Sequence, residues 1–257
     1  MFKLKFFLPL VWLVICYSGL AVAQEEMNDQ LYWIREEVAK INMLQQYEET
    51  SKQWVGLMTE GGLDLPYVRA SQRNDGHYYY LIPLSNYAEI DKFSSVFGSV
   101  LDKIGKEKWG EFITANESSI ETHRDFIAKW SAKYSYVPKE SRTKQGEAEF
   151  IHWVFFKYKL EKRQEVLDVI AEWKALYEKN NIPDGWGIWL VEIGLDNNSI
   201  ALTETAKDGA SFYSAMKENS DKLKEEEAKL WAKLSVNVLS IEEYYGKPRP
   251  DLTYTKK

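Results

Sequence analysis

Three histidines, His77, His123 and His152, are the side chains of this sequence most suited to acid–base or metal chemistry. None has a second histidine or a carboxylate at a metal-ligand spacing such as HExxH, so we expect no metal site. His77 adjoins a predicted turn and His123 lies in a charged, helical stretch, where both would be solvated. His152 lies in a predicted strand and could enter a cavity as an acid–base group or haem ligand, although a structural role is the simpler interpretation.

Other catalytic motifs are absent from the sequence. It contains no serine-hydrolase elbow, no Walker loop and no dinucleotide-binding glycine pattern. Its one cysteine, Cys16, lies in a leader-like segment, so the remaining chain offers no disulfide, thiol nucleophile or thiolate metal site. Carboxylates are abundant, but pairing them for acid–base work needs three-dimensional geometry. The sequence therefore leaves open whether the protein is an enzyme.

The first 23 residues have the pattern of a signal peptide. Lys3 and Lys5 precede the apolar run Phe6–Leu20, and Ala21–Ala23 offers small residues for cleavage. The run is shorter than the roughly 20 residues of a membrane-spanning helix. A lipoprotein signal is an alternative, since Leu13–Cys16 resembles a lipobox with one unsuitably large residue. We expect an exported protein, periplasmic or extracellular, without stable membrane insertion after cleavage.

The charge of the chain limits its partners. The sequence has 33 lysines and arginines against 39 acidic residues, a net charge of −6, and cleavage of the leader would remove two further lysines. An acidic chain without a basic stripe is a poor candidate for binding nucleic acid or an anionic membrane. The expected partner is a small molecule, with no nucleic acid.

The two halves of the chain resemble each other. Leu31–Val38 aligns with Ile151–Tyr158, which places Trp33 over Trp153 at an offset of 120 residues. Phe126–Ser131 aligns with Leu230–Ser235 at a smaller offset of 104. The difference predicts an insertion in the first half, near residues 106–119, in an otherwise duplicated chain.

Each half has the pattern strand–helix–strand–strand–helix–strand. In the first half we expect strands at 32–40, 67–72, 78–84 and 133–137 and helices at 43–57, 88–104 and 109–129. In the second half we expect strands at 150–159, 187–193, 199–205 and 239–245 and helices at 163–178 and 210–234. Asn74-Asp75-Gly76 is a strong hairpin signal.

This order is that of the split βαβ, or ferredoxin-like, unit. The predicted units span residues 24–140 and 148–247, with an irregular tail at 248–257. With this order, and with Arg35–Lys40 leading into Tyr47-Glu48, the chain resembles the dimeric α/β-barrel superfamily in a tandem version. The resemblance implies an α+β fold in which two ferredoxin-like βαββαβ units pair through their sheets as an intramolecular barrel. Members include cofactor-independent and haem-degrading monooxygenases and stress-responsive proteins, so the fold does not select an activity.

Polar side chains on the predicted strands indicate where a ligand could bind. The strand face that meets helices should be apolar, so we expect polar residues to face the barrel interior. The predicted ligand-binding residues are Trp33, Arg35, Arg69, Tyr79, Lys157, Glu192 and Glu204, framed by further aromatic side chains. The alternative is that the charged residues form salt bridges across the seam between the sheets.

The sequence favours a non-catalytic, cofactor-free binder of a small ligand in a cleft between the two sheets. One alternative is a barrel-type monooxygenase or isomerase acting on a small hydrophobic substrate, with His152 or a buried carboxylate as base and haem as a further option. Another is a protein-interaction module. Because one chain supplies both units, a monomer is the simplest expectation, and a dimer remains open.

We predict that the exported protein begins at Gln24, because a signal peptidase reads the small residues Ala21 and Ala23. The intact mass of protein recovered from outside the cytoplasm checks this start. A mass that retains the first 23 residues, or a lipid on Cys16, would contradict it.

Overall fold

The computed structural model describes residues 27–196 and 198–256. The predicted signal peptide, residues 1–23, lies outside the described residues. Within the described part of the chain, no helix is both long enough and apolar enough to cross a membrane.

The elements alternate between strands and helices in both halves. The first half contains β1 (Gln30–Ala39), η1 (Ile41–Met43), α1 (Leu44–Gly61), β2 (Tyr67–Arg73), β3 (His77–Leu84), η2 (Tyr87–Glu89), α2 (Ile90–Ile104), α3 (Lys106–Ser119) and β4 (Ile120–Trp130). The second half contains β5 (Phe150–Tyr158), η3 (Leu160–Lys162), α4 (Arg163–Lys179), β6 (Trp186–Ile193), β7 (Ser199–Ala206), α5 (Gly209–Ser235), β8 (Val238–Pro248), η4 (Pro250–Leu252) and β9 (Tyr254–Thr255).

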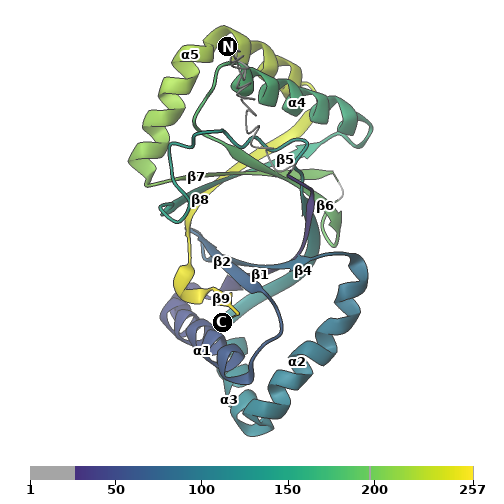
Figure 1. The fold of residues 1–257 in the computed structure, drawn as a ribbon, viewed down its shortest axis with the longest axis vertical. Helices are drawn as coiled ribbons and strands as arrows, with labels where there is room; N and C mark the ends of the chain where they lie inside the picture. The colour runs from purple at the N-terminus through teal and green to yellow at the C-terminus, as the bar shows by residue number, and fades with distance from the viewer. Residues whose placement is uncertain (1–26, 197, 257) are drawn as a thin grey trace, which may run out of the picture.

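Eight antiparallel strands close into a single barrel. Their order is β3-β1-β4-β6-β7-β5-β8-β2, and β2 pairs again with β3. The halves therefore join edge to edge, through the seams β4–β6 and β8–β2. Figure 1 looks down this barrel, with α1, α2 and α3 covering one half and α4 and α5 covering the other. The predicted α+β fold, an intramolecular dimeric α/β-barrel, is confirmed.

Each strand sends alternate side chains into the barrel and under the helices. In β5, Trp153 and Phe155 join the cluster inside the barrel. Val154, Phe156 and Tyr158 join the core beneath α4 and α5. An apolar strand such as β5 is thus buried on both faces, which explains its near-continuous apolar sequence.

The seam between β8 and β2 depends on one glycine. Gly246 lies opposite Arg73 in the register of the two strands. A Cβ atom at Gly246 would lie 1.8 Å from the carbonyl oxygen of Gln72, so no other residue fits without backbone movement.

The last strand of the first half differs from the prediction. We expected a helix at 109–129 and a strand at 133–137, but α3 ends at Ser119 and β4 runs from Ile120 to Trp130. The alignment of Phe126–Ser131 with Leu230–Ser235 was wrong, because the first segment is mostly strand and the second is helix. Pairing with almost the whole of β1 stabilises β4 as a strand despite its helix-compatible sequence.

The structure also shifts the match between the two halves by one residue. The 3-10 helices η1 and η3 follow the first strand of each half and begin at Ile41 and Leu160. The separation between these two residues is one residue shorter than the separation between Trp33 and Trp153. Trp153 therefore corresponds to Ile34, and both lie in the cluster inside the barrel. The sequence duplication itself stays a prediction.

The C-terminal tail is ordered rather than irregular. β9 pairs with the start of β2, and the Tyr254 hydroxyl donates to the carbonyl of Leu63 at 2.6 Å. Arg249, 5% exposed, donates to Glu48 on α1, to Gln72 on β2 and to Asp251. The tail thus follows the last long strand of the second half and binds to α1, β2 and Leu63 of the first half.

We predict that Arg249→Met lowers the free energy of unfolding by about 2–3 kcal/mol, because it removes charged hydrogen bonds and leaves Glu48 without its cationic partner. The matched control is Lys256→Met, which removes an exposed pair between the same tail and Asp64 and should change the free energy of unfolding much less. Urea unfolding curves measure both values. Equal effects of the two substitutions would show that the tail is not fastened through Arg249.

Candidate functional site

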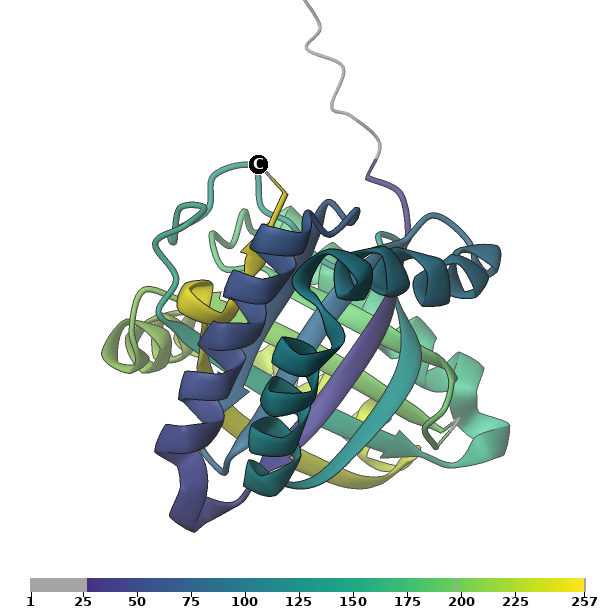
Figure 2. The same ribbon diagram turned by 90° about the horizontal axis from the view of Figure 1, so that it is seen from below.

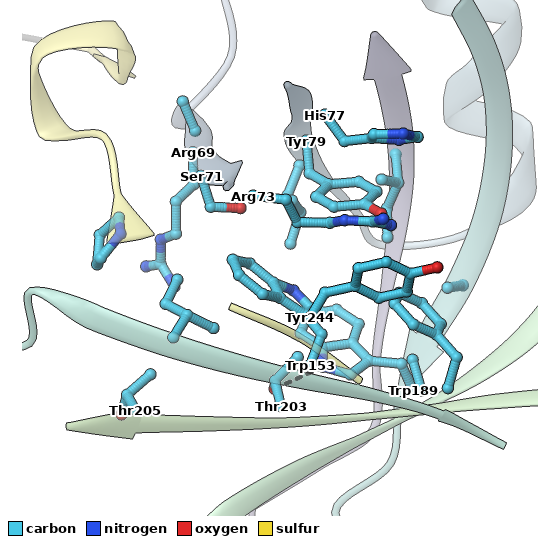
Figure 3. Close-up of a pocket in the computed structure, with 18 of the residues that line it drawn as sticks. Arg69, Ser71, Arg73, His77, Tyr79, Trp153, Trp189, Thr203, Thr205 and Tyr244 are labelled. Atoms are coloured by element: carbon cyan, nitrogen blue, oxygen red, sulfur yellow. Dashed lines mark hydrogen bonds between the residues drawn. The ribbon is translucent and has the colours of Figure 1, made fainter. Parts of the chain in front are cut away.

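The barrel encloses a cavity of about 1460 Å³. Its wall is mainly apolar and aromatic, contributed by strands of both halves: Ile34, Leu81, Phe126, Ala128, Ile151, Trp153, Phe155, Trp189, Val191 and Ala201. Hydroxyl groups of Ser71, Thr203, Thr205 and Tyr244 interrupt this wall (Figure 3). Apolar walls with a few fixed polar groups are typical of small-molecule pockets.

An aromatic band occupies the middle of the cavity. The rings of Tyr79 and Trp153 lie 6.1 Å apart, across from each other on strands of opposite halves. The Trp189 ring lies 5.3 Å from Tyr32, and its indole nitrogen donates to the Thr203 hydroxyl at 2.9 Å. The indole N–H is therefore satisfied, and the ring orientation is fixed before any ligand enters.

Arg73 is a buried cation at one end of the cavity, 5% exposed. Its guanidinium lies 3.4 Å from the centre of the Tyr244 ring, donates to the Tyr79 hydroxyl at 2.9 Å and pairs with Asp75 (Figure 3). Burial opposes the charge, but Tyr79 and Asp75 raise the pKa of Arg73 above its ordinary value. This arginine is held by three partners and is a fixed part of the wall.

Glu36 lies next to this arginine in a charged network. It is 1% exposed, lies 2.7 Å from Nδ1 of His77 and forms an ion pair with Arg124. Burial favours protonation, yet the hydrogen bonds from His77 and Arg124 outweigh it and lower the pKa of Glu36 to about 2. Glu36 is therefore an ionised structural carboxylate that holds the rim of the barrel together.

Three of the predicted ligand-binding residues line the cavity: Arg69, Tyr79 and Lys157. Tyr79 lies in the aromatic band. Lys157 is at the rim, where its ammonium donates to Asp196 at 2.7 Å. Arg69 makes no hydrogen bond or ion pair with any described residue, and its guanidinium lies 5.2 Å from the Tyr67 ring.

Trp33 and Arg35 do not face the cavity, and the expectation that they do was wrong. The Trp33 ring stacks on Phe93 of α2 at 4.5 Å. Arg35 pairs with Glu37 and Asp125, and Glu37 in turn accepts a hydrogen bond from Tyr47 of α1 at 2.7 Å. This strand face is polar because α1 supplies polar partners for it.

Glu192 and Glu204 were also expected in the cavity, and both lie elsewhere. Glu192 accepts a hydrogen bond from the Tyr87 hydroxyl at 3.2 Å and lies 3.5 Å from the Lys129 ammonium. Glu204 faces the helix side of β7, where it lies 2.8 Å from Nδ1 of His152. Both carboxylates form polar contacts on the outer surface of the barrel.

His152 is buried, but it does not point into the cavity. Its ring stacks on Tyr245 at 5.1 Å and contacts Phe212 of α5 at 4.9 Å. Nδ1 bonds Glu204, while Nε2 has no hydrogen bond and lies 3.4 Å from a carboxylate oxygen of Glu243. The predicted role of His152 as a base or ligand inside the barrel is therefore excluded by its orientation.

A haem would need an axial ligand, such as an imidazole or another donor aimed into the space. Among the lining residues, the one histidine is His77, whose Nδ1 is bonded to Glu36 and whose Nε2 lies 3.8 Å from Asp75 without a hydrogen bond to a described residue. A carboxylate on one ring nitrogen is usual for a histidine that binds a metal through the other, so His77 is the residue that would hold the iron. The Tyr79 hydroxyl is occupied by Arg73. Across the described residues, moreover, no group of three or more His, Cys, Asp or Glu side chains could hold a metal ion.

Sequence reasoning missed Arg73, Glu36 and the role of His77. His77 was expected to be solvated, but it is half-buried and binds Glu36. His123 is exposed as expected, although it lies on β4 rather than on a helix. The signal that could have found the network is spacing: Arg73 shares a strand face with Arg69 and Ser71.

We predict that the ionisation of Glu36 makes the free energy of unfolding depend on pH in the acid range. Its pKa is lower in the folded protein than in the unfolded chain, so its contribution is present above about pH 4.5 and is lost as the pH falls toward 2. The shift corresponds to about 3 kcal/mol. Glu36→Gln should therefore show a shallower loss of stability between these pH values than the wild-type protein, measured by urea unfolding.

The control for Glu36 is Asp221→Asn, which removes an exposed i,i+4 pair with Lys217 on α5. It should leave the change of the free energy of unfolding with pH almost as in the wild-type protein. If Glu36→Gln shows the same pH dependence as the wild-type protein, the network does not hold an ionised carboxylate.

Comparison with known proteins shows likeness in structure but not in sequence. No family model and no curated protein matches the sequence. Solved structures do match. An anthrone oxidase-like protein has a TM-score of 0.59 at 9% identity, over 88% of this chain and 93% of that one.

Two further structures are similar over most of their length. A proposed monooxygenase from Lactobacillus acidophilus has a TM-score of 0.51 at 8% identity, over 90% of this chain and 97% of that one. A chlorite dismutase from Candidatus Nitrospira defluvii, in complex with imidazole, has a TM-score of 0.51 at 10% identity, over 86% and 92%. At such identities the likeness concerns the fold alone. The chain has the fold of the dimeric α/β-barrel superfamily, with both halves of the barrel in one polypeptide.

Proposed function

We propose that this protein binds a small, largely apolar molecule inside its barrel. The observation that carries the proposal is the cavity of about 1460 Å³, whose wall combines aromatic side chains of both halves with fixed hydroxyl groups. The indole N–H of Trp189 already has a hydrogen-bond acceptor, and Arg73 is already held by Tyr79, Asp75 and Tyr244. These side chains therefore lose little conformational freedom when a ligand binds.

The state of the polar groups supports binding without catalysis. A general base works best with a pKa near the operating pH, whereas the pKa of Glu36 is about 2. His152 lies on the helix side of its strand, packed between Phe212 and Tyr245. Neither the buried carboxylate Glu36 nor His152 is thus placed and poised for proton transfer in the cavity.

A barrel-type oxygenase acting on a small hydrophobic substrate is the second candidate. Two structural neighbours, a proposed monooxygenase and an anthrone oxidase-like protein, favour it. An apolar barrel would suit such a substrate equally well. Binding is the preferred proposal because the polar groups of Tyr79, His77 and Tyr244 in the cavity lining are held in contacts with other side chains of the protein.

Location and assembly belong to the proposal as well. If the leader is cleaved, the binder acts outside the cytoplasm, and its ligand comes from there. One chain supplies all eight strands, so the cavity needs no second copy to be complete.

We predict that protein purified gently from its own host carries a stoichiometric extra mass in native mass spectrometry. Ala201→Phe, which fills the cavity from β7, should abolish this mass, because the new ring occupies the space of the ligand. The control is Ala232→Phe on the exposed surface of α5, which should retain it.

An absorbance spectrum of the same sample tests the alternatives. A Soret band would contradict the cofactor-free cavity. A wild-type protein without added mass, and without affinity for any apolar probe, would contradict binding altogether.

A further inference from the structure

We propose that the ligand carries an anionic group and that Arg69 binds this group at one end of the barrel. This inference rests on the proposed binding function and specifies its ligand as an organic anion with an apolar body. The carrying observation is a difference in charge between the two ends of the cavity.

Arg69 lies near the start of β2, where the C-terminal tail crosses the strand. The neighbouring Ala70 donates its N–H to the Thr253 hydroxyl at 3.0 Å, and its carbonyl accepts from the N–H of Arg249 at 3.0 Å. Tyr67 pairs with Thr255 of β9. The backbone around Arg69 is thus fixed on both sides, while its guanidinium lines the cavity without a hydrogen bond to any described residue.

A second unpaired cation lines the same end. The segment 131–149, which joins the two halves, contributes Lys144 to the cavity lining, and no hydrogen bond or ion pair to its ammonium is found within the described residues. Glu147 does not line the cavity, and its carboxylate accepts a hydrogen bond from the backbone N–H of Lys144 at 3.2 Å. Figure 2 shows this segment and the C-terminus at the same end of the barrel.

The remaining polar side chains at this end are the amide of Gln145 and the hydroxyls of Ser141, Thr143, Thr205, Thr253 and Thr255, of which that of Thr253 already donates to the carbonyl of Arg249. Hydroxyl groups can donate to an anion and add no competing negative charge. Figure 3 shows Arg69 and Thr205 toward one end of the cavity, and Arg73 and His77 toward the other.

All carboxylates of the lining lie at the opposite end, and each has a partner. Asp75 pairs with Arg73, Asp196 pairs with Lys157, and Glu242 accepts from the Tyr244 hydroxyl at 2.9 Å. That end is therefore internally neutralised. The end with Arg69 and Lys144 is left positive, in a chain whose net charge is −6.

An unpaired guanidinium beside an apolar wall favours a ligand with a negative charge over a neutral one. An anion bound there gains charge-assisted hydrogen bonds, which are stronger next to a low-dielectric wall than in water. A neutral ligand of the same shape would cover the cation without pairing it, which is unfavourable. The aromatic band beyond Arg69 receives the apolar body of the same molecule.

The test uses two fluorescent probes of similar shape. Anilinonaphthalene sulfonate carries an anionic group, and N-phenylnaphthylamine lacks it. We expect Arg69→Gln in the full-length chain to weaken binding of the sulfonate by about tenfold or more, the value of one charged hydrogen bond, and to leave binding of the neutral probe the same or stronger. The matched control is Lys217→Gln, which removes a paired cation from the exposed surface of α5 and should change neither affinity.

The outcomes separate this inference from the proposed function. If neither probe binds the wild-type protein, the proposed function fails. If both probes bind but Arg69→Gln weakens them equally, or weakens neither, the cavity binds apolar molecules and the anion site is wrong. A loss of sulfonate affinity as large in Lys217→Gln as in Arg69→Gln would also overturn it.

Discussion

Closure of the barrel through the β4–β6 and β8–β2 seams governs the rest of the structure. In a closed sheet, each side chain of a strand points either into the barrel or to its outer face, which the helices cover in part. The hydrogen bonds of the seams fix the register of the strands, and the register fixes which residues meet inside. Trp153 and Tyr79 come together from opposite halves only because both seams hold.

The fold and most elements could be predicted from the sequence because their signals are local. The Asn74-Asp75-Gly76 turn, with Gly76 at φ +84°, defines the hairpin, and alternation defines β2, β3 and β7 nearly to the residue. β4 could not be found in this way. Its partner strands are distant in sequence, and pairing with β1 outweighs the helical appearance of the segment.

The face of each strand was harder to predict than the strand itself. Arg35 and Glu204 were expected inside because a helix-covered face is normally apolar. In this protein the outer face carries its own polar partners, such as Tyr47 for Glu37 and Glu204 for His152. A polar residue beneath a helix is tolerated when a partner is supplied there, and a single sequence does not reveal that partner.

The tail that fastens onto α1 and β2 has a consequence for how the chain is made. Arg249 bonds Glu48, and Tyr254 bonds Leu63, so these contacts of the first half form only after residues 249–254 have been synthesised. Pairing over so long a stretch of sequence forms slowly. Until β9 is in place, the start of β2 has an open edge, which is a template for pairing with another chain. Residues 249–255 thus make completion of the first half of the barrel depend on synthesis of the second.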